Sequence, residues 1–156
     1  MAKPIKGGAP CSIARTVDVL KDPWSFLILR EALAGVTRFA DFRENLGIAS
    51  DILTERLGSL VDHGVLTREP YREAGSRARF SYHLTEAGLQ LQIVIGALQQ
   101  WGDDYLPYPG GPTVERVNRR TGRPLSVGFI DRGRAVRDVD VAFVRTPAYP
   151  APRVAR

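Results

Sequence analysis

Residues 36–84 constrain the fold more than any other part of this chain of 156 residues. Apolar residues recur at helical spacing over residues 37–46 and again over residues 50–63. The intervening turn, 47–49, begins with Gly47, a residue that readily adopts the left-handed conformation that ends a helix. Two runs rich in β-branched and aromatic residues follow, at 65–71 and 80–84. This order predicts two helices joined by a tight turn, and then a β-hairpin with an arginine-containing tip.

Two earlier helices and several helix caps are also predicted. Residues 12–20 show one apolar face, and Pro23 is favoured at the first position of a new helix that Asp22 would cap. The run 24–34 is apolar on most sides, as expected for the central helix of a core. Thr37 and Ser50 are the expected caps of the next two helices.

A long helix is expected after the hairpin, with Thr85 as its cap. Its apolar residues alternate at spacings of four and three, the pattern of paired helices. The apolar face is wider than one small domain needs, which predicts a homodimer in which this helix meets its copy. The expected dimerisation residues are Leu91, Val94, Leu98, Trp101 and Tyr105.

The remainder of the chain is expected to form a linker and a small appendage. Residues 107–112 are rich in Pro and Gly, and 113–118, 125–131 and 139–146 are short β-prone runs between arginine-rich turns. The predicted organisation is therefore a disordered lead-in at 1–10, a main domain at 11–106, the linker at 107–112, a β appendage at 113–146 and a disordered tail at 147–156.

The net charge of +5 is divided unevenly along the chain. Residues 1–112 hold 12 basic and 13 acidic residues, a net charge of −1, whereas residues 113–156 hold 10 arginines and 4 acidic residues, a net charge of +6. Bulk charge therefore cannot support nucleic-acid binding by the main domain. Any such surface must come from local clusters of arginine.

These elements predict an α+β fold, mainly α: a winged helix-turn-helix domain with a long C-terminal dimerisation helix and a small β-rich appendage. A helix that enters the major groove needs an exposed face of short or polar residues and an opposite face locked to a scaffold, and residues 50–63 offer both. Amides near Thr37 and Arg38 and the hairpin arginines would contact phosphate or the minor groove. The expected DNA-binding residues are Thr37, Arg38, Ser50, Asp51, Thr54, Glu55, Arg56, Arg77 and Arg79.

Other interpretations of the same residues are open. Any three-helix bundle could show a similar spacing of apolar residues. Arg77 and Arg79 could simply be solvated surface charges. Arg56 could pack its aliphatic stem against the core, or its guanidinium could pair with a carboxylate, instead of contacting phosphate. We find no motif for catalysis, no metal-binding cluster and no cofactor loop, so the sequence predicts neither an enzyme nor a cofactor. A single cysteine and the absence of long apolar runs predict a cytoplasmic protein that is not in the membrane.

Several motifs together resemble the HxlR-type winged-helix regulators, relatives of the MarR-type repressors. The resemblance covers residues 11–105, and it includes the runs 20–24 and 27–31, Arg38-Phe39, 53–57 and 82–88. It implies a homodimeric transcription factor in which two wings straddle a pseudo-palindromic operator in double-stranded DNA. The appendage resembles a small ribbon of some members, but their metal-ligand cysteines are absent here, so zinc binding is not expected.

The resemblance also offers two hypotheses for regulation. Cys11 matches the position at which some members sense oxidants or electrophiles, although a small apolar residue packed at the dimer seam is the alternative role. A small-molecule effector is the second hypothesis: Trp24, Phe26, Trp101 and Tyr105 could line an apolar pocket near that seam, or simply pack in the core. The arginine-rich appendage could add phosphate affinity or act as a structural flap over the dimer.

Overall fold

The computed structural model describes residues 10–75 and 77–149, and these form two compact units. Of these described residues, unit 1 contains 10–75, 77–91 and 147–149, and unit 2 contains 92–146. Helix α6 therefore belongs with the segment that follows it, not with the helices that precede it. The expected lead-in at 1–10 and tail at 147–156 lie largely outside the described residues.

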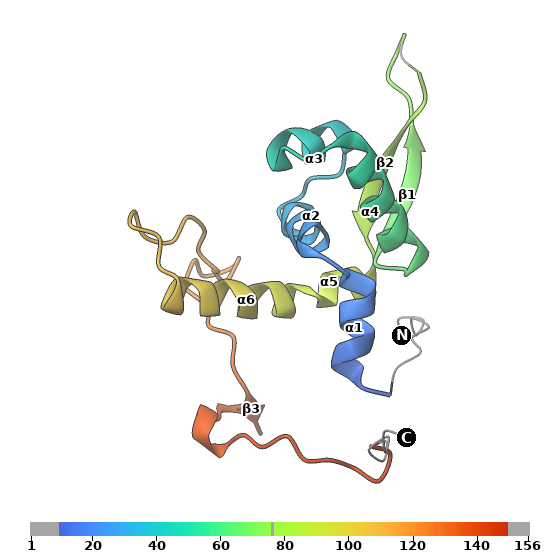
Figure 1. Cartoon of the computed structure of the whole chain (residues 1–156). Helices are drawn as coiled ribbons and strands as arrows, with labels where there is room; N and C mark the ends of the chain where they lie inside the picture. The colour runs from blue at the N-terminus through green and yellow to red at the C-terminus, as the bar shows by residue number, and fades with distance from the viewer. Residues whose placement is uncertain (1–9, 76, 150–156) are drawn as a thin grey trace. The chain divides into compact units, whose positions relative to one another are not determined.

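Unit 1 has the predicted order of helices and strands (Figure 1). Its elements are α1 (Ser12–Leu20), α2 (Pro23–Leu33), α3 (Phe39–Leu46), α4 (Ser50–Asp62), β1 (Leu66–Tyr71), β2 (Arg79–Leu84) and α5 (Glu86–Gln90). Gly47, with φ of 60°, ends α3 in the left-handed region as expected. The winged helix-turn-helix arrangement is confirmed.

Two of the four predicted helix caps are confirmed and two are wrong. Asp22 accepts hydrogen bonds from the amides of Trp24 and Ser25, and Thr85 accepts one from the amide of Gly88. The caps of α3 and α4 are instead Arg38 and Ala49, neither of which provides a side-chain hydrogen bond.

The two errors have local causes. The Thr37 carbonyl accepts a hydrogen bond from the Tyr82 amide (2.8 Å), so its backbone is extended alongside the hairpin. Ser50 already lies inside the first turn of α4, one residue beyond the cap. Sequence patterns locate helix ends only to within about one or two residues, and both discrepancies are of that size.

The core of unit 1 is built by the buried faces of α1 to α4 and the start of the hairpin. These helices and strands enclose a set of side chains that are less than 2% exposed: Leu20, Ile28, Leu29, Phe42, Leu53, Leu57, Leu60, Val65 and Leu66. On α4 the three leucines form the single stripe that their spacing predicts. The core therefore fixes which face of α4 remains in solvent.

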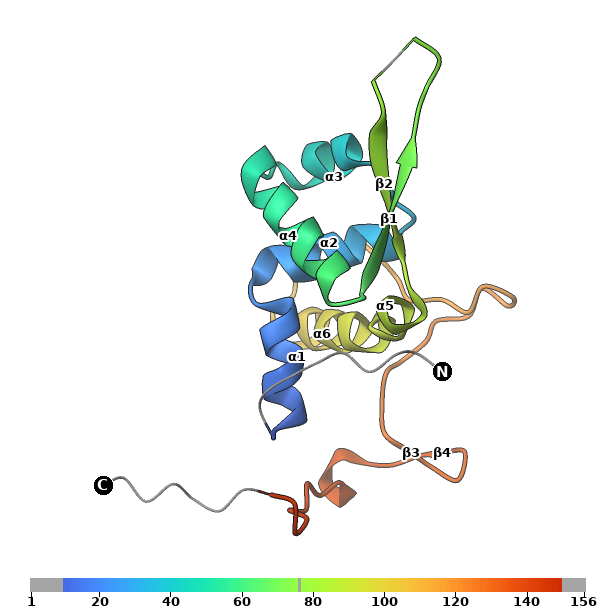
Figure 2. The same cartoon turned by 90° about the vertical axis from the view of Figure 1, so that its right-hand side faces the viewer.

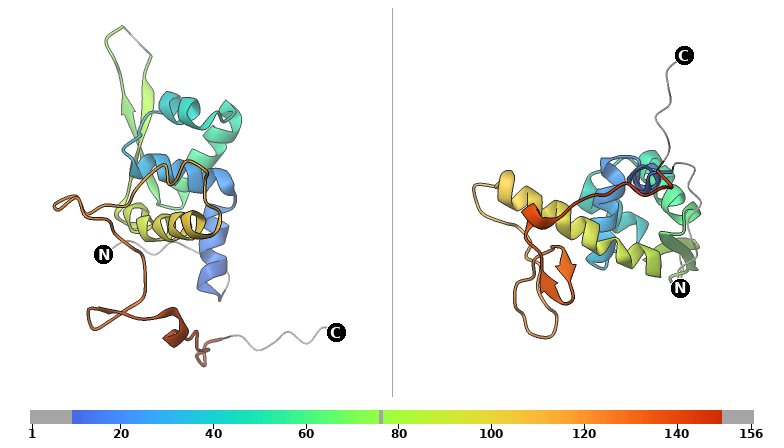
Figure 3. Two further views of the ribbon diagram at one scale, coloured as in Figure 1. Left: turned by 90° about the vertical axis from the view of Figure 1, so that its left-hand side faces the viewer. Right: turned by 90° about the horizontal axis from the view of Figure 1, so that it is seen from below.

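The hairpin is joined to the helices by a short third pairing. Strands β1 and β2 are antiparallel, with Leu66 opposite Leu84 at the base and Tyr71 opposite Arg79 towards the tip. Arg38 forms an isolated antiparallel bridge to Ser81, immediately before α3. Figures 2 and 3 show the hairpin rising beside α3 and α4 and extending past them.

The long helix predicted after Thr85 is interrupted at Leu91, which separates α5 from α6 (Gln92–Tyr105). The amide of Leu91 bonds to the carbonyl of Gly88 at 3.1 Å, a tighter pattern than that of an α-helix. Gly88 is buried against the backbone of Val65, so α5 is fixed to unit 1 by close backbone contact.

Unit 2 consists of α6, the chain that folds along it, and a small hairpin. Its other elements are β3 (Ile130–Asp131), β4 (Arg134–Ala135) and a 3₁₀ turn, Asp138–Asp140. Of the three expected β-runs, only 125–131 contains strand residues, those of β3. The run 113–118 contributes only an isolated bridge between Val117 and Pro124, the run 139–146 forms no strand, and β4 lies in a segment that was expected to be a turn. No described helix has the length and apolar character needed to cross a membrane.

The strands of unit 2 are short because its backbone groups bond to side chains of α6. The Gln100 amide donates to the Val127 carbonyl (2.9 Å), and its oxygen accepts from the Val127 amide (2.8 Å). Gln99 donates to the Val114 carbonyl at 2.6 Å. These contacts satisfy backbone groups that a β-ladder would otherwise use.

Candidate nucleic-acid interface

A basic hollow lies in unit 1 between helices α3 and α4 and the wing, meaning the β1–β2 hairpin. Its volume is about 490 Å³. It is lined by Phe39, Ala40, Arg43, Thr54, Arg68, Tyr71, Arg79, Phe80 and Tyr82. Three arginines from three different elements face this space, and none of the nine lining residues is a carboxylate. Such a hollow is suited to a phosphate backbone that passes between a helix in the major groove and a wing.

Packing against aromatic rings positions one of these arginines. The guanidinium carbon of Arg68 lies 4.3 Å from the centre of the Phe80 ring. Burial raises the pKa of Tyr82, and the neighbouring Arg68, through its charge and a hydrogen bond, opposes that rise. The neutral phenol and the stacked guanidinium thus form a fixed wall of the hollow.

Arg38 is held at the junction between α3 and the wing. It forms an ion pair with Glu73 at 2.9 Å and lies over the ring of Tyr71, 5.2 Å from its centre. Glu73 and Tyr71 both lie in the wing, so these contacts of Arg38 connect the wing to the start of α3. Its side chain is about half exposed, which leaves part of the guanidinium open to solvent.

The exposed face of α4 carries the predicted short polar residues. Ser50, Asp51, Thr54 and Glu55 are exposed, while Leu53 and Leu57 on the opposite face are fully buried. The Thr54 hydroxyl donates to the Ser50 carbonyl at 2.7 Å, which holds the side chain close to the helix. This face therefore presents little bulk and can approach the floor of a groove.

Arg56 lies away from that face. Its Nε is 2.5 Å from Oδ2 of Asp22, its Nη1 is 2.8 Å from Oε1 of Glu55, and its side chain is only 20% exposed. Because Asp22 also caps α2, Arg56 connects α4 to the start of α2. Of the two roles left open by the sequence, the structure places this residue in the carboxylate pair.

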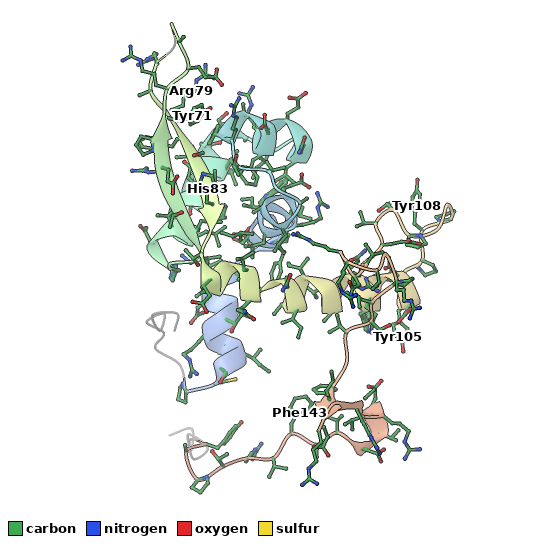
Figure 4. The ribbon with its side chains drawn as sticks, turned by 180° about the vertical axis from the view of Figure 1, so that it is seen from behind. Tyr71, Arg79, His83, Tyr105, Tyr108 and Phe143 are labelled. Atoms are coloured by element: carbon green, nitrogen blue, oxygen red, sulfur yellow. The ribbon has the colours of Figure 1, made fainter. Side chains whose placement is uncertain are left out.

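The two predicted wing arginines lie at different positions along the hairpin. Arg79 begins β2 opposite Tyr71 and lines the hollow, whereas Arg77 is exposed in the tip beyond the strands. Figure 4 shows Tyr71 and Arg79 towards the far end of the hairpin and His83 nearer its base. Thr37 lies beneath the wing, with its carbonyl bonded to Tyr82.

Sequence reasoning missed Arg43 and Arg68. Arg43 is on the solvent side of α3 and reaches towards Ser50, with 3.4 Å between its Nη1 and the Ser50 hydroxyl. Arg68 sits in β1 opposite Tyr82. Alternation along the strand could have placed Arg68 on one face of the hairpin, but only the bridge between Arg38 and Ser81 shows that this face meets α3.

The predicted dimerisation residues differ in exposure. Leu98, Trp101 and Tyr105 are 52%, 57% and 68% exposed, and the rings of the last two lie 5.4 Å apart. Val94 and Leu91 are partly buried. Helix α6 has no buried residue, and the C-terminal half of its apolar stripe, from Leu98 onwards, is exposed.

Cys11 and a second hollow both lie at helix α1 of unit 1. Cys11 is exposed and directly precedes α1. A hollow of about 240 Å³ in unit 1 is lined by residues of α1, α5 and their neighbours: Ser12, Arg15, Thr16, Val19, Leu20, Val65, Ala87 and Leu91. Neither Trp24 nor Phe26 lines it. Within residues 10–75 and 77–149, no three metal-ligating side chains gather into a cluster.

Comparison with known proteins gives consistent matches. Residues 19–109 match the model of the HxlR-like helix-turn-helix family. An HTH-type transcriptional regulator of Mycobacterium tuberculosis is 44% identical over 111 residues, which are 71% of this chain and 69% of that protein.

Two solved structures extend the comparison. That of PA1607, a proposed transcription factor, is 37% identical with a TM-score of 0.76, and the match covers 88% of this chain and 96% of that one. The reduced form of the redox regulator HypR is 27% identical with a TM-score of 0.54, and covers 60% of this chain and 92% of that one.

Proposed function

Because this chain belongs to the HxlR-like helix-turn-helix family, whose members are transcriptional regulators, we propose that it binds operator DNA as a homodimer through the basic hollow of unit 1. The observation that carries the proposal is the convergence of Arg43, Arg68 and Arg79 beside the exposed face of α4. In this arrangement α4 enters the major groove, the arginines contact the adjoining phosphates, and the tip of the wing reaches the minor groove.

The DNA-binding surface comprises residues with two kinds of role. Ser50, Asp51, Thr54 and Glu55 face the bases, and Arg38, Arg43, Arg68, Arg77 and Arg79 face the backbone. Thr37 supports the wing, and Arg56 holds α4 against α2. Because residues 1–112 have a net charge of −1, affinity depends on these few arginines.

Replacement of a hollow-lining arginine tests this surface. Footprinting on the DNA upstream of its own gene identifies the operator, and titrations at several salt concentrations then compare Arg79→Gln with the wild type. Loss of one phosphate contact in each protomer lowers the salt slope by about 2 per dimer. Arg30→Gln is the matched control, because Arg30 is exposed on α2 and paired with Glu31. Equal slopes for all three proteins would contradict the proposed surface.

Dimerisation through α6 is supported by its open apolar stripe. Replacement of Leu98 by Asp places a charge in that stripe and is expected to shift the protein from dimer to monomer in analytical ultracentrifugation. Gln92→Asp is the control, since it introduces the same charge at an exposed polar position of the same helix. If the wild-type protein sediments as a monomer, the proposed dimerisation through α6 is contradicted.

Redox regulation through Cys11 is a second element, supported by the exposure of the thiol and by the similarity to a redox regulator. With one cysteine per chain, oxidation can produce a disulfide between protomers or a mixed disulfide with a small thiol. Diamide is expected to change the DNA affinity of the wild type but not that of Cys11→Ser. The same response in both proteins would refute a role for the thiol.

A further inference from the structure

Unit 2 carries a turn, residues 118–123, that holds three arginines on a fixed backbone. The Asn118 amide donates to the Arg123 carbonyl at 2.8 Å, and the side-chain oxygen of Asn118 accepts from the amides of Arg120 (2.9 Å) and Thr121 (3.2 Å). Gly122, with φ of +68°, completes the turn in the left-handed region. We call residues 118–123 the arginine turn.

The arginine turn is anchored to helix α6 within unit 2. Arg116, two residues before it, lies 3.5 Å from Asp103 of the helix, and Gln99 holds the Val114 carbonyl. After the turn, the side chain of Gln100 bonds to both backbone groups of Val127. Both ends of the segment that carries the turn are therefore attached to one rigid helix.

The guanidinium groups of the turn are available to a ligand. Arg119, Arg120 and Arg123 are exposed, and within the described part of the chain no carboxylate lies within ion-pairing distance of them. The carboxylate of Asp103, on the helix that anchors this segment, is already paired with Arg116. The turn thus concentrates three positive charges that the protein itself does not neutralise.

We infer that the arginine turn is a second, sequence-independent contact for the phosphate backbone of DNA. The turn exposes only arginine, threonine and glycine, without the apolar side chains that insert into a membrane surface. Guanidinium groups bind phosphate oxygens in a bidentate manner. The inference rests on the proposed function, and it assigns to unit 2 the nonspecific affinity that the near-neutral unit 1 lacks.

The test compares the wild-type full chain with the triple variant Arg119→Gln, Arg120→Gln, Arg123→Gln. Each is titrated with the operator duplex and with a duplex of mixed sequence at several salt concentrations. The triple variant is expected to bind both duplexes at least tenfold more weakly at low salt and to lower the salt slope by about 3 per protomer. The ratio of operator to mixed-sequence affinity stays unchanged, because phosphate contacts carry no sequence information.

Three controls separate the effect of the turn from that of net charge and from misfolding. Arg137→Gln removes one positive charge from the same unit, but that arginine is held by Asp140 at 2.9 Å, so its effect is expected to be smaller than that of Arg120→Gln. The triple Arg→Lys variant keeps the charges and is expected to retain most of the salt slope. An unchanged circular dichroism spectrum confirms that the triple Gln variant is folded.

The outcomes distinguish the inference from the proposed function. If the wild type binds the operator and the triple Gln variant keeps its salt slope, the inference is overturned while the proposed function stands. Equal effects of Arg137→Gln and Arg120→Gln would also overturn it, because net charge alone would then explain the loss. If the wild type binds neither duplex, the proposed function itself fails.

Discussion

The two units of this protein differ in the interactions that stabilise each of them internally. Every described residue that is buried lies in unit 1, where four helices and the base of the wing enclose aliphatic side chains and Phe42. Unit 2 has no buried residue among those described, and its chain is attached to α6 by glutamine and arginine side chains. Hydrophobic burial therefore stabilises unit 1, whereas unit 2 leaves much of its apolar surface exposed.

The lack of buried side chains in unit 2 is also evident around the small hairpin formed by β3 and β4. Figure 4 shows Phe143 beside β3 and β4, at a distance from Tyr105 and Tyr108, which mark the end of α6. The ring of Phe143 meets that of Phe129 edge to face at 6.3 Å, yet it remains 88% exposed. Such contacts fix local geometry without forming a core.

The largest expected effect comes from truncation of a core leucine. Leu57→Ala in α4 removes a fully buried side chain and is expected to lower the free energy of unfolding by about 2–5 kcal/mol. Leu98→Ala in unit 2 removes a side chain that is half exposed, and should cost less than about 0.5 kcal/mol in the monomer. Urea denaturation at low protein concentration measures both. Similar losses would show that unit 2 has a core as well.

Two helical glycines give a sharper comparison. A Cβ at Gly88 would overlap the backbone carbonyl of Val65, so Gly88→Ala is expected to cost about 1–3 kcal/mol. A Cβ at Gly96 would lie 3.2 Å from a methyl group of Val127, a milder overlap than that with a backbone carbonyl, and alanine favours the helix by about 1 kcal/mol. Gly96→Ala should therefore cost less than Gly88→Ala. Thermal unfolding of both variants checks this, and a stabilised Gly88→Ala would contradict the tight docking of α5.

One ion pair in each unit allows the cost of losing an arginine to be compared between the units. Arg56→Met leaves the cap carboxylate of Asp22 without its partner and is expected to cost about 1–2 kcal/mol. Arg116→Met breaks the longer pair with Asp103 (3.5 Å) and should cost no more than about 1 kcal/mol. Native-state hydrogen exchange reports each loss separately, at the start of α2 and in α6. Greater loss of protection in α6 would reverse the expected order.

The smallest effect concerns alkaline pH. Burial raises the pKa of Tyr82 above its ordinary value of 10.0, so the unfolded chain loses this proton first as the pH rises. The stability of unit 1 is therefore unaffected by Tyr82 below pH 10.0 and falls as the pH rises above it. Tyr82→Phe should flatten this part of the stability profile. An equally steep decline in the variant would assign the effect to other groups.

Prediction from the sequence succeeded where the pattern is local. The helix-turn-helix order follows from apolar spacing and Gly47, and the caps at Asp22 and Thr85 follow from residue type. The exposed face of α4 follows from its leucine stripe. The break at Leu91 was not predicted, because the apolar spacing continues through this residue and indicates one continuous helix.

The candidate site was only partly predictable. The sequence pointed to the wing and to the polar face of α4, but it did not associate Arg43 with Arg68, which come from a helix and a strand. It also left two roles open for Arg56, which the proximity of Asp22 resolves. Pairing across the fold cannot be inferred from the spacing along one element.

By itself, the sequence determined the order of the elements, the buried faces of α2 to α4 and the concentration of positive charge after residue 112. These properties depend on neighbours a few residues apart, which helical and strand periodicity bring onto one face. Only the tertiary structure decided which arginines share the hollow and which of the remaining arginines pair with a carboxylate. Those outcomes depend on distances between separate elements, and packing of the core sets them.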